Sequence, residues 1–130
     1  MKALLVVAHG SRREASNDEV RQLCARIQEK NGNEEFDVVR AGFLELADPS
    51  IPEGIEQCIR LGAERVVVLP YFLSAGRHVS EDIPAEVDKA RAANPHVAIH
   101  LAPYLGSAPG VARLLVELAE GEEKNGDSIE

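Results

Sequence analysis

The sequence has few cysteines and no long apolar run, and each shortage excludes a class of protein. Its two cysteines, Cys24 and Cys58, lie 34 positions apart and outside any C-x-x-C arrangement, so neither a zinc knuckle nor a disulfide framework is expected. No stretch approaches the ~20 apolar residues of a membrane span, and the first apolar run, Ala3 to Ala8, is shorter than the ~7–15 residues of a signal-peptide core. We therefore expect a cytoplasmic protein whose cysteines, each on an apolar helical stripe, lie in the core.

Basic residues are also scarce. The 130 residues contain 14 Lys and Arg against 22 Asp and Glu, a formal net charge of −8. This balance argues against nucleic-acid and anionic-membrane partners, because both need an excess of Lys and Arg. The last fourteen residues, however, carry six acids and one base, a net of −5, which leaves only −3 on residues 1–116. A partner that bears carboxylates is therefore not excluded.

Glycine-rich phosphate-binding motifs are missing as well. Gly10 stands in neither G-x-G-x-x-G nor G-x-x-x-x-G-K-[ST], so a dinucleotide or triphosphate site has no backbone cradle. Ser11 lies near His9, but the G-x-S-x-G turn of hydrolases is absent, and neighbours in sequence rarely point at each other correctly. A small hydrolase or phosphatase is therefore a weak hypothesis. It would gain support only if the structure placed the Ser11 hydroxyl against an imidazole.

What the sequence does contain is a strand and a helix in alternation, four times over. The continuous apolar run over 3–8 predicts a strand buried on both faces, which is typical of a parallel sheet covered by helices. Stripes with a period of 3.6 residues predict the helices, and Ser50 and Asp82 are expected to begin the second and third of them. The predicted strands cover 3–8, 36–43, 65–71 and 96–101, and the predicted helices 16–31, 51–61, 83–90 and 111–118.

This alternation predicts one α/β domain of the small flavodoxin-like kind. We expect a four-stranded parallel sheet in the order 2-1-3-4 with helices on both faces. The second strand is less apolar than the first and is therefore expected near an edge. The domain is expected over 1–119, followed by an acidic, disordered tail over 120–130, where the chain loses almost all its apolar residues.

Ionisable side chains follow three of the predicted strands: His9 the first, Glu45 the second and His78 the third. Ligands of open parallel sheets bind beyond the carboxyl ends of the strands, so these residues are expected to converge on one rim. Two imidazoles and a carboxylate suit an exchangeable divalent first-row metal. Each also has a structural reading, His9 as a cap of the sheet, His78 as a solvated loop residue and Glu45 as a surface carboxylate. His96 and His100 belong to the fourth strand and are expected to be structural or solvated.

The same rim carries positive charge in an otherwise acidic protein. Arg12 and Arg13 follow the first strand, and Arg77 follows the third. Guanidinium groups pair bidentately with carboxylates, so one reading is a site for an acidic small molecule. The other reading is a solvated surface.

Three segments of the sequence resemble one family: A-H-G-S-R over 8–12, F-L-E-L-A-D-P-S over 43–50, and L-P-Y-F-L-S-A-G-R-H-V-S-E-D-I-P over 69–84. Together they are similar to the short, single-domain sirohydrochlorin chelatases of the CbiX type, class II chelatases related to SirB and more distantly to ferrochelatase. The likeness covers about residues 1–118. Its specific part is the pairing of His-Gly-Ser with Gly-x-His-x-x-x-Asp-Ile-Pro, since either element alone is a weak signal.

The resemblance implies insertion of a divalent metal, Co²⁺ or Fe²⁺ with Ni²⁺ as a further option, into sirohydrochlorin on the route to cobalamin or siroheme, with no organic cofactor. It implies that His9 and His78 bind the metal and accept pyrrole protons, and that Glu45 contributes to metal binding. Long members of the family hold two such units, so a homodimer is expected to supply the second half. The residues expected to contact the ring are Ser11, Arg12, Arg13, Leu44, Phe72, Leu73, Arg77 and Tyr104.

The leading hypothesis is therefore a sirohydrochlorin chelatase with a tetrapyrrole and a metal ion as substrates and with no nucleic-acid or membrane partner. The alternative is a non-catalytic metal or tetrapyrrole carrier that uses the same residues and binds stoichiometrically without turnover. The residues do not select among Co²⁺, Fe²⁺ and Ni²⁺, because imidazole binds all three. With five aromatic residues and no Trp, ring orientation is expected to depend mainly on charge.

Overall fold

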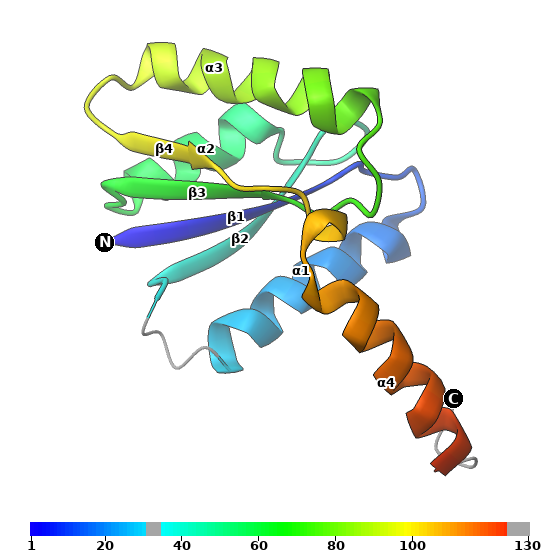
Figure 1. Ribbon diagram of the computed structural model, residues 1–130. Coiled ribbons are helices and arrows are strands. Elements are labelled where there is room, and N and C mark those ends of the chain that lie inside the picture. Colours follow the sequence, from blue (N-terminus) through cyan, green and yellow to red (C-terminus); the bar gives the residue numbers. More distant parts are fainter. Residues whose placement is uncertain (31–34, 125–130) are drawn as a thin grey trace.

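The computed structural model describes residues 1–30 and 35–124, and its centre is a parallel four-stranded sheet (Figure 1). The strands lie in the order β2-β1-β3-β4, as predicted, and every neighbouring pair is parallel. The α/β class and the flavodoxin-like strand order are thereby confirmed, and the second strand is at an edge. The strands are β1 (Lys2–Ala8), β2 (Val38–Phe43), β3 (Arg65–Pro70) and β4 (Ala98–Leu101).

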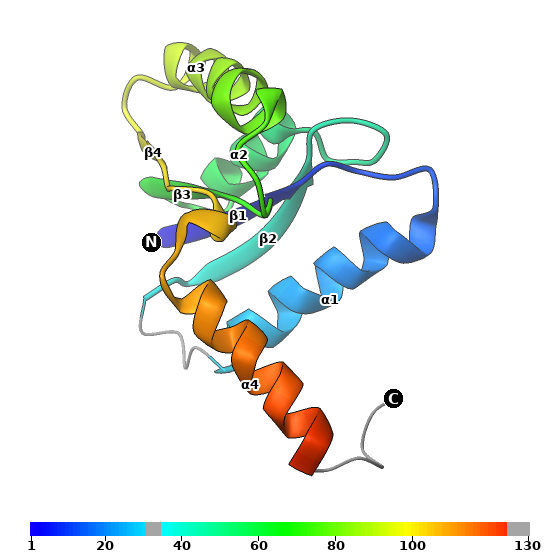
Figure 2. The ribbon, with the colours of Figure 1, turned by 45° about the vertical axis from the view of Figure 1, so that its right-hand side comes forward.

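Helices cover the two faces of the sheet unequally. Two helices, α2 and α3, lie on one face, α1 lies on the other, and α4 extends away from the body of the domain (Figures 1 and 2). Among the described residues, no helix is both long and apolar enough to cross a bilayer. The helices are α1 (Glu14–Lys30), α2 (Ile51–Arg60), α3 (Ile83–Ala93) and α4 (Gly110–Lys124), with short turns η1 (His78–Asp82) and η2 (Leu105–Ser107).

Buried side chains form one cluster on each face of the sheet. Successive residues of a strand point to opposite faces, so Leu5 packs with Ile55 of α2 on one side, whereas Val6 packs under α1 with Phe43 on the other. Strand β1 is therefore covered on both faces. This burial explains the continuous apolar run of β1.

Both cysteines belong to these clusters as free thiols, Cys24 on the buried side of α1 and Cys58 on the buried side of α2. Burial raises the pKa of the Cys24 thiol to about 11 and raises the pKa of the Cys58 thiol in the same direction. Each cysteine is a neutral core residue at neutral pH. The prediction that they have a packing role is confirmed.

The start of α2 follows the sequence prediction closely. The Ser50 hydroxyl accepts a hydrogen bond from the Glu53 backbone N–H at 3.2 Å, and the Glu53 carboxylate accepts one from the Ser50 N–H at 3.1 Å. This reciprocal pair satisfies two backbone donors that a helix start would otherwise leave unpaired. It also ends the loop after β2 at a defined position, which matters for Glu45 in that loop.

The predicted helix cap at Asp82 is wrong. The π-helical turn η1 runs directly into α3, so Asp82 already has helical backbone angles (φ −71°, ψ −47°) and its side chain caps nothing. Because no free helix start exists at this position, the carboxylate is available for another contact. The first helix also begins at Glu14, two residues before the predicted start.

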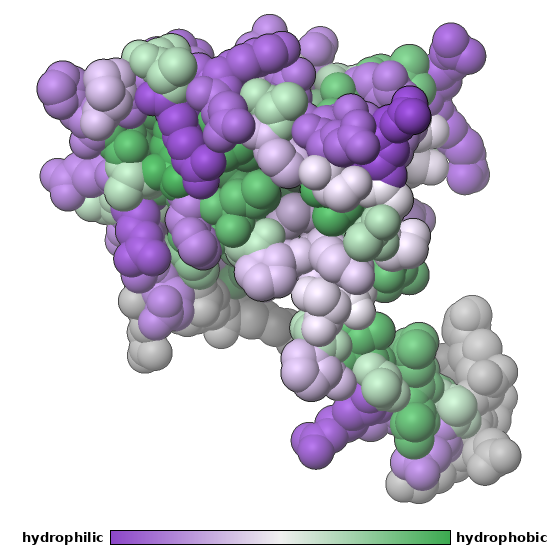
Figure 3. Space-filling view, turned by 45° about the horizontal axis from the view of Figure 1, so that its top comes forward, coloured by the Kyte–Doolittle hydropathy of each residue, from purple (hydrophilic) through white to green (hydrophobic). Residues whose placement is uncertain are grey.

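The fourth predicted helix forms, but its apolar side chains lie in solvent. Leu114, Leu115, Val116 and Leu118 are between 54% and 64% exposed. Figure 3 shows hydrophobic surface along the projecting helix. The helix continues to Lys124, and residues 125–130 of the predicted tail lie outside the described residues.

Candidate active site

Three loops at the carboxyl ends of the strands bring the predicted site residues together. His9 follows β1, Glu45 follows β2, and His78 opens η1 after the loop that follows β3. The His9 Nε2 atom lies 3.1 Å from the Glu45 Oε2 atom. The rings of His9 and His78 meet edge to face, with 4.7 Å between their centroids. The convergence expected from the strand order is therefore present in the structure.

The loops after β1 and β2 are joined backbone to backbone. The Leu44 N–H donates to the Ala8 carbonyl at 2.9 Å, and the Glu45 N–H donates to the His9 carbonyl at 3.0 Å. Gly10 allows this approach, because its φ of +98° is in the left-handed region and a Cβ there would overlap the Glu45 carbonyl oxygen. The contact between His9 and Glu45 thus depends on a glycine at position 10, because a larger residue there would push the two loops apart.

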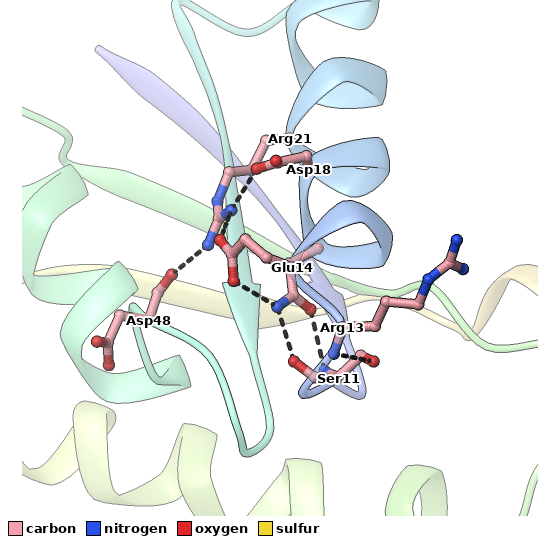
Figure 4. Close-up of polar contacts among 7 residues, drawn as sticks. Ser11, Arg13, Glu14, Asp18, Arg21 and Asp48 are labelled. Carbon is pink, nitrogen blue, oxygen red and sulfur yellow. Dashed lines mark hydrogen bonds and ion pairs between the residues drawn. The ribbon is translucent and has the colours of Figure 1, made fainter.

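A buried asparagine fixes the turn that follows His9. Asn17 is 1% exposed, and its amide both accepts from the Ser11 N–H at 3.0 Å and donates to the Ser11 carbonyl at 2.8 Å. The amide group also donates to the Glu14 carboxylate at 3.1 Å (Figure 4). These bonds satisfy the turn's backbone groups away from water. The sequence alone did not single out Asn17, which reads there as an ordinary helix-start residue.

An ion-pair network extends from this turn to the loop after β2. Arg21 donates to Glu14 at 2.7 Å, to Asp18 at 2.8 Å and to the Asp48 carbonyl at 3.1 Å (Figure 4). The hydrogen bond from Arg21 lowers the pKa of the Glu14 carboxyl, and the same contact raises the pKa of Arg21. The network links the start of α1 to the segment that carries Glu45.

Asp82 is a site residue that the sequence analysis missed. Its Oδ2 atom lies 2.8 Å from the Nδ1 atom of His78, one helical turn away. A carboxylate on one ring nitrogen favours the tautomer with the proton on that nitrogen, which leaves the lone pair on the other nitrogen, Nε2. The i, i+4 spacing of His78 and Asp82 is visible in the sequence, but it predicts a contact between them only if the segment is helical.

His9 and Glu45 are spaced as two neighbouring ligands of one metal ion. Ligands ~2.1 Å from a divalent ion at adjacent octahedral positions are ~3.0 Å apart, close to the 3.1 Å between Nε2 and Oε2. Among residues 1–30 and 35–124, no group of three or more His, Cys, Asp or Glu side chains is placed to hold an ion together. His78 lies beside the two-ligand pair and does not complete a three-ligand set.

The His9 ring has an acceptor on each side. Its Nδ1 atom lies 3.0 Å from the Gly10 carbonyl, and its Nε2 atom faces Glu45. A neutral imidazole carries one N–H, so with Nδ1 donating to Gly10 the Nε2 lone pair faces a carboxylate. A cation placed between the two atoms would turn this repulsion into attraction.

The residues expected to contact the ring surround the histidines in different ways. Phe72 lies with its ring centroid 6.4 Å from that of His78, and Leu73 is 72% exposed beside it. Tyr104 is half-buried, and Leu44 packs partly against the core under α2 and α3. Part of the apolar surface around the histidines is therefore open to a ligand.

The three arginines at the rim are exposed, and the Arg77 side chain is 80% exposed with only a 4.0 Å contact to Glu81. Arg13 is turned away from the ion-pair network in Figure 4. The Ser11 hydroxyl accepts from the Arg13 backbone N–H at 2.9 Å. It makes no hydrogen bond to an imidazole within the described part of the chain, so the hydrolase hypothesis gains no support.

Other features lie apart from this cluster. His96 and His100 are exposed, as expected. A hollow of about 530 Å³ lies between α1 and the edge strand β2, with Cys24, Arg40 and Gln57 among its lining residues. None of the predicted site residues lines this hollow. The hollow therefore lies apart from the cluster of His9, Glu45 and His78.

Comparison with known proteins gives one family. A family model described as CbiX matches residues 3–121. The sirohydrochlorin cobaltochelatase of Methanocaldococcus jannaschii is 38% identical over 84 residues, 65% of this chain and 57% of the relative. A sirohydrochlorin ferrochelatase of Priestia megaterium is 35% identical over 117 residues, 90% of this chain and 43% of the relative. The chain thus spans about half the length of these curated relatives.

Two solved structures share the fold. The putative cobalamin biosynthesis CbiX protein of Marinobacter aquaeolei superimposes with a TM-score of 0.77 at 26% identity, over 95% of this chain and 98% of that one. The sirohydrochlorin chelatase SirB of Bacillus subtilis subspecies spizizenii, in complex with cobalt, superimposes with a TM-score of 0.78 at 28% identity, over 92% of this chain and 50% of SirB. With a family model that matches almost the whole described chain, this protein belongs to the CbiX family.

Proposed function

We propose that this chain inserts a divalent metal ion, Co²⁺ or Fe²⁺, into sirohydrochlorin. The observation that carries the proposal is the facing pair of imidazoles, His9 and His78, 4.7 Å apart and each in contact with a carboxylate. Membership of the CbiX family supports it, as do the names of the relatives, which refer to cobalt and to iron. Metallation needs a group that delivers the ion and groups that remove two pyrrole protons, and the pair supplies both.

His9 and Glu45 form the side of the site that receives the ion. The Nε2 lone pair and the carboxylate are spaced as neighbouring ligands. Two protein ligands leave most coordination positions to water, so the ion sheds its remaining ligands readily as the ring nitrogens replace them. A closed four-ligand site would hold the ion too tightly for transfer. The partial exposure of both side chains also leaves an entry path from solvent.

His78 and Asp82 form the side of the site that accepts protons. The reaction converts M²⁺ and the diprotonated ring into the metallated ring and two H⁺. The Nε2 atom of His78 accepts one pyrrole proton, and Asp82 on Nδ1 stabilises the imidazolium that results. Glu45, released as the ion passes to the ring, is the acceptor for the second proton.

The ring itself is held by charge and by a modest apolar surface. Arg12, Arg13 and Arg77 are exposed at the rim, where their guanidinium groups meet the peripheral carboxylates of the ring. Phe72 and Leu73 offer the apolar contact next to His78. Ser11, Leu44 and Tyr104 complete the surface in this proposal.

A second copy of the chain completes the enclosure of the ring. The superposition on SirB covers 50% of the SirB chain, so one copy of the unit matches half of that protein. A homodimer supplies the missing half. The proposal needs no organic cofactor and places the reaction in the cytoplasm. The imidazole and carboxylate donors accept Co²⁺, Fe²⁺ and Ni²⁺ alike, so the physiological ion is set by supply as well as by the site.

The test is an insertion assay that follows the change in ring absorbance when the chain, sirohydrochlorin and Co²⁺ or Fe²⁺ are mixed. Catalysis above the spontaneous rate is expected, and His78→Ala is expected to lose on the order of 10²-fold or more in rate while remaining folded. His96→Ala, an exposed histidine outside the site, is the matched control and is expected to keep the full rate. No acceleration with any of the three ions would refute the proposal. Tight stoichiometric binding without turnover would assign the chain as a carrier instead.

A further inference from the structure

The loop that carries Glu45 contains a residue in an unfavourable backbone conformation. Leu46, the next residue along the chain, has a φ of +67°, in the left-handed region. This conformation costs a residue other than glycine ~1–2 kcal/mol, and a side chain that is 51% exposed offsets little of that cost by packing. The loop therefore keeps its shape through contacts with other segments of the chain.

Arg21 of α1 contacts both ends of this loop. Its guanidinium carbon lies 5.1 Å from the centroid of the Phe43 ring, at the end of β2 where the loop begins. Phe43 is fully buried, so the guanidinium rests on a fixed ring. The Nη2 atom of Arg21 donates to the Asp48 carbonyl at 3.1 Å, near the other end of the loop. Glu45 thus lies between the two points that Arg21 holds.

The same guanidinium is tied to the turn after β1. Its Nη1 atom donates to one oxygen of the Glu14 carboxylate at 2.7 Å, and the other oxygen accepts from the Asn17 amide at 3.1 Å. The Asn17 amide in turn holds the backbone N–H and carbonyl of Ser11 (Figure 4). A continuous chain of polar contacts therefore joins the loop after β2 to the turn after β1.

The spacing of the candidate metal pair depends on where these two segments lie. His9 and Glu45 stand on different loops, and the 3.1 Å between Nε2 and Oε2 joins two partly exposed side chains that lie outside both core clusters. The backbone bond from the Glu45 N–H to the His9 carbonyl fixes the start of the loop, and the contact with Asp48 fixes its end. If the end were released, Leu46 would relax toward a commoner backbone angle, and the carboxylate of the residue before it would shift.

We propose that Arg21 is a positioning residue for the metal ion that His9 and Glu45 receive. This role rests on the proposed function, in which these two side chains are ligands of the incoming ion. Arg21 touches neither the ion nor the ring. It holds the loop of Glu45 in the conformation that sets the spacing of the two ligand atoms before the ion arrives. Ligands that are already in place bind the ion without a further loss of conformational freedom, so the contribution of Arg21 is to metal affinity.

The shape of the guanidinium is needed for this role as well as its charge. The planar group directs Nη1 to the carboxylates of Glu14 and Asp18 and Nη2 to the carbonyl of another loop. Lysine carries the same charge on one compact donor group and cannot reproduce this fork. Arg21→Lys is therefore expected to keep an ion pair with the carboxylates of α1 and to lose the hold on Asp48.

The test measures the affinity of the protein for Co²⁺ alone by titration calorimetry, together with the free energy of unfolding in urea. Arg21→Gln is expected to raise the Kd for Co²⁺ by ~10–100-fold, and Arg21→Lys is expected to raise it similarly while losing less stability. Arg91→Gln is the matched control, because Arg91 in the last turn of α3 also pairs with a carboxylate three residues earlier, Asp88 at 3.1 Å, and donates to the Ile99 carbonyl at 3.0 Å. The control is expected to lose stability without a change in Kd. An unchanged Kd in Arg21→Gln, or equal changes in Arg21→Gln and Arg91→Gln, would overturn the proposal.

A double-mutant cycle with Glu45→Gln shows whether Arg21 acts through Glu45. In the Glu45→Gln background, Arg21→Gln is expected to change the Kd for Co²⁺ by less than ~2-fold. Effects that multiply would overturn the positioning role, as would a parent chain whose Co²⁺ affinity does not depend on Glu45, whatever its insertion rate. The expected Kd values in a chain that inserts no metal into sirohydrochlorin would support the positioning role and refute the proposed reaction, so the two failures are distinguishable.

Discussion

Asp82→Asn is the sharpest single change, because it alters one atom of the contact that orients His78. The carboxylate lies 2.8 Å from Nδ1, and both side chains are about two-fifths exposed. Removing the charge leaves an amide of the same shape, which can rotate its N–H₂ toward the ring and favour the wrong tautomer. Partners of this kind typically contribute ~10–100-fold to activity, whereas an exposed ion pair contributes only ~0–1 kcal/mol to stability.

The assay compares kcat and KM for metal insertion with the free energy of unfolding in urea. Asp82→Asn is expected to lower kcat by ~10–100-fold with little change in KM for the ring or in stability. Asp82→Glu, which keeps a carboxylate, is expected to restore part of the loss. Glu81→Gln removes the same charge one residue earlier without a histidine contact and serves as control. Equal effects of Asp82→Asn and Glu81→Gln would refute the positioning role.

Three further expectations concern the scaffold of the site. Asn17→Ala leaves two backbone groups of the preceding turn unpaired and is expected to cost ~2–4 kcal/mol of unfolding free energy in urea, whereas a loss below ~0.5 kcal/mol would contradict the role of that side chain. Cys24 and Cys58 are expected not to react with a thiol reagent in the native protein and to react fully after denaturation; a reactive native thiol would contradict their burial. Because Arg21 lowers the pKa of Glu14, their pair stabilises the fold above the ordinary carboxyl pKa and is lost as the pH falls through the lowered value. Glu14→Gln is therefore expected to flatten the acid side of the stability profile, and an unchanged profile would count against the pair.

Most of the fold could be predicted from the sequence because each signal was local. The apolar run of β1, the stripe of α2 and the cap at Ser50 each depend on residues within a few positions of one another. The strand order was expected by analogy with flavodoxin-like sheets, which is one of several orders that right-handed crossovers allow, and the structure has that order. The convergence of His9 and His78 then followed from the strand order.

The parts that could not be predicted depend on contacts between distant segments. The sequence around Asp82 predicts a helix cap, and only the π-helical turn before it shows that no helix begins there. The sequence around Asn17 predicts a helix start, and only the hydrogen bond from the Ser11 N–H shows that its side chain holds the preceding turn. The exposure of Leu118 cannot be read from its stripe, because periodicity shows which side of a helix is apolar and not what covers it.

The most direct test of the account is a double-mutant cycle of His9→Ala and His78→Ala in the insertion assay. If the two imidazoles act on the same ion and ring, either single variant removes most of the catalysis and the double variant loses little more. This strongly non-additive result is expected, with the rate of the double variant close to that of the slower single variant. Losses that simply multiply would mean that the two histidines act independently, and they would contradict the central claim.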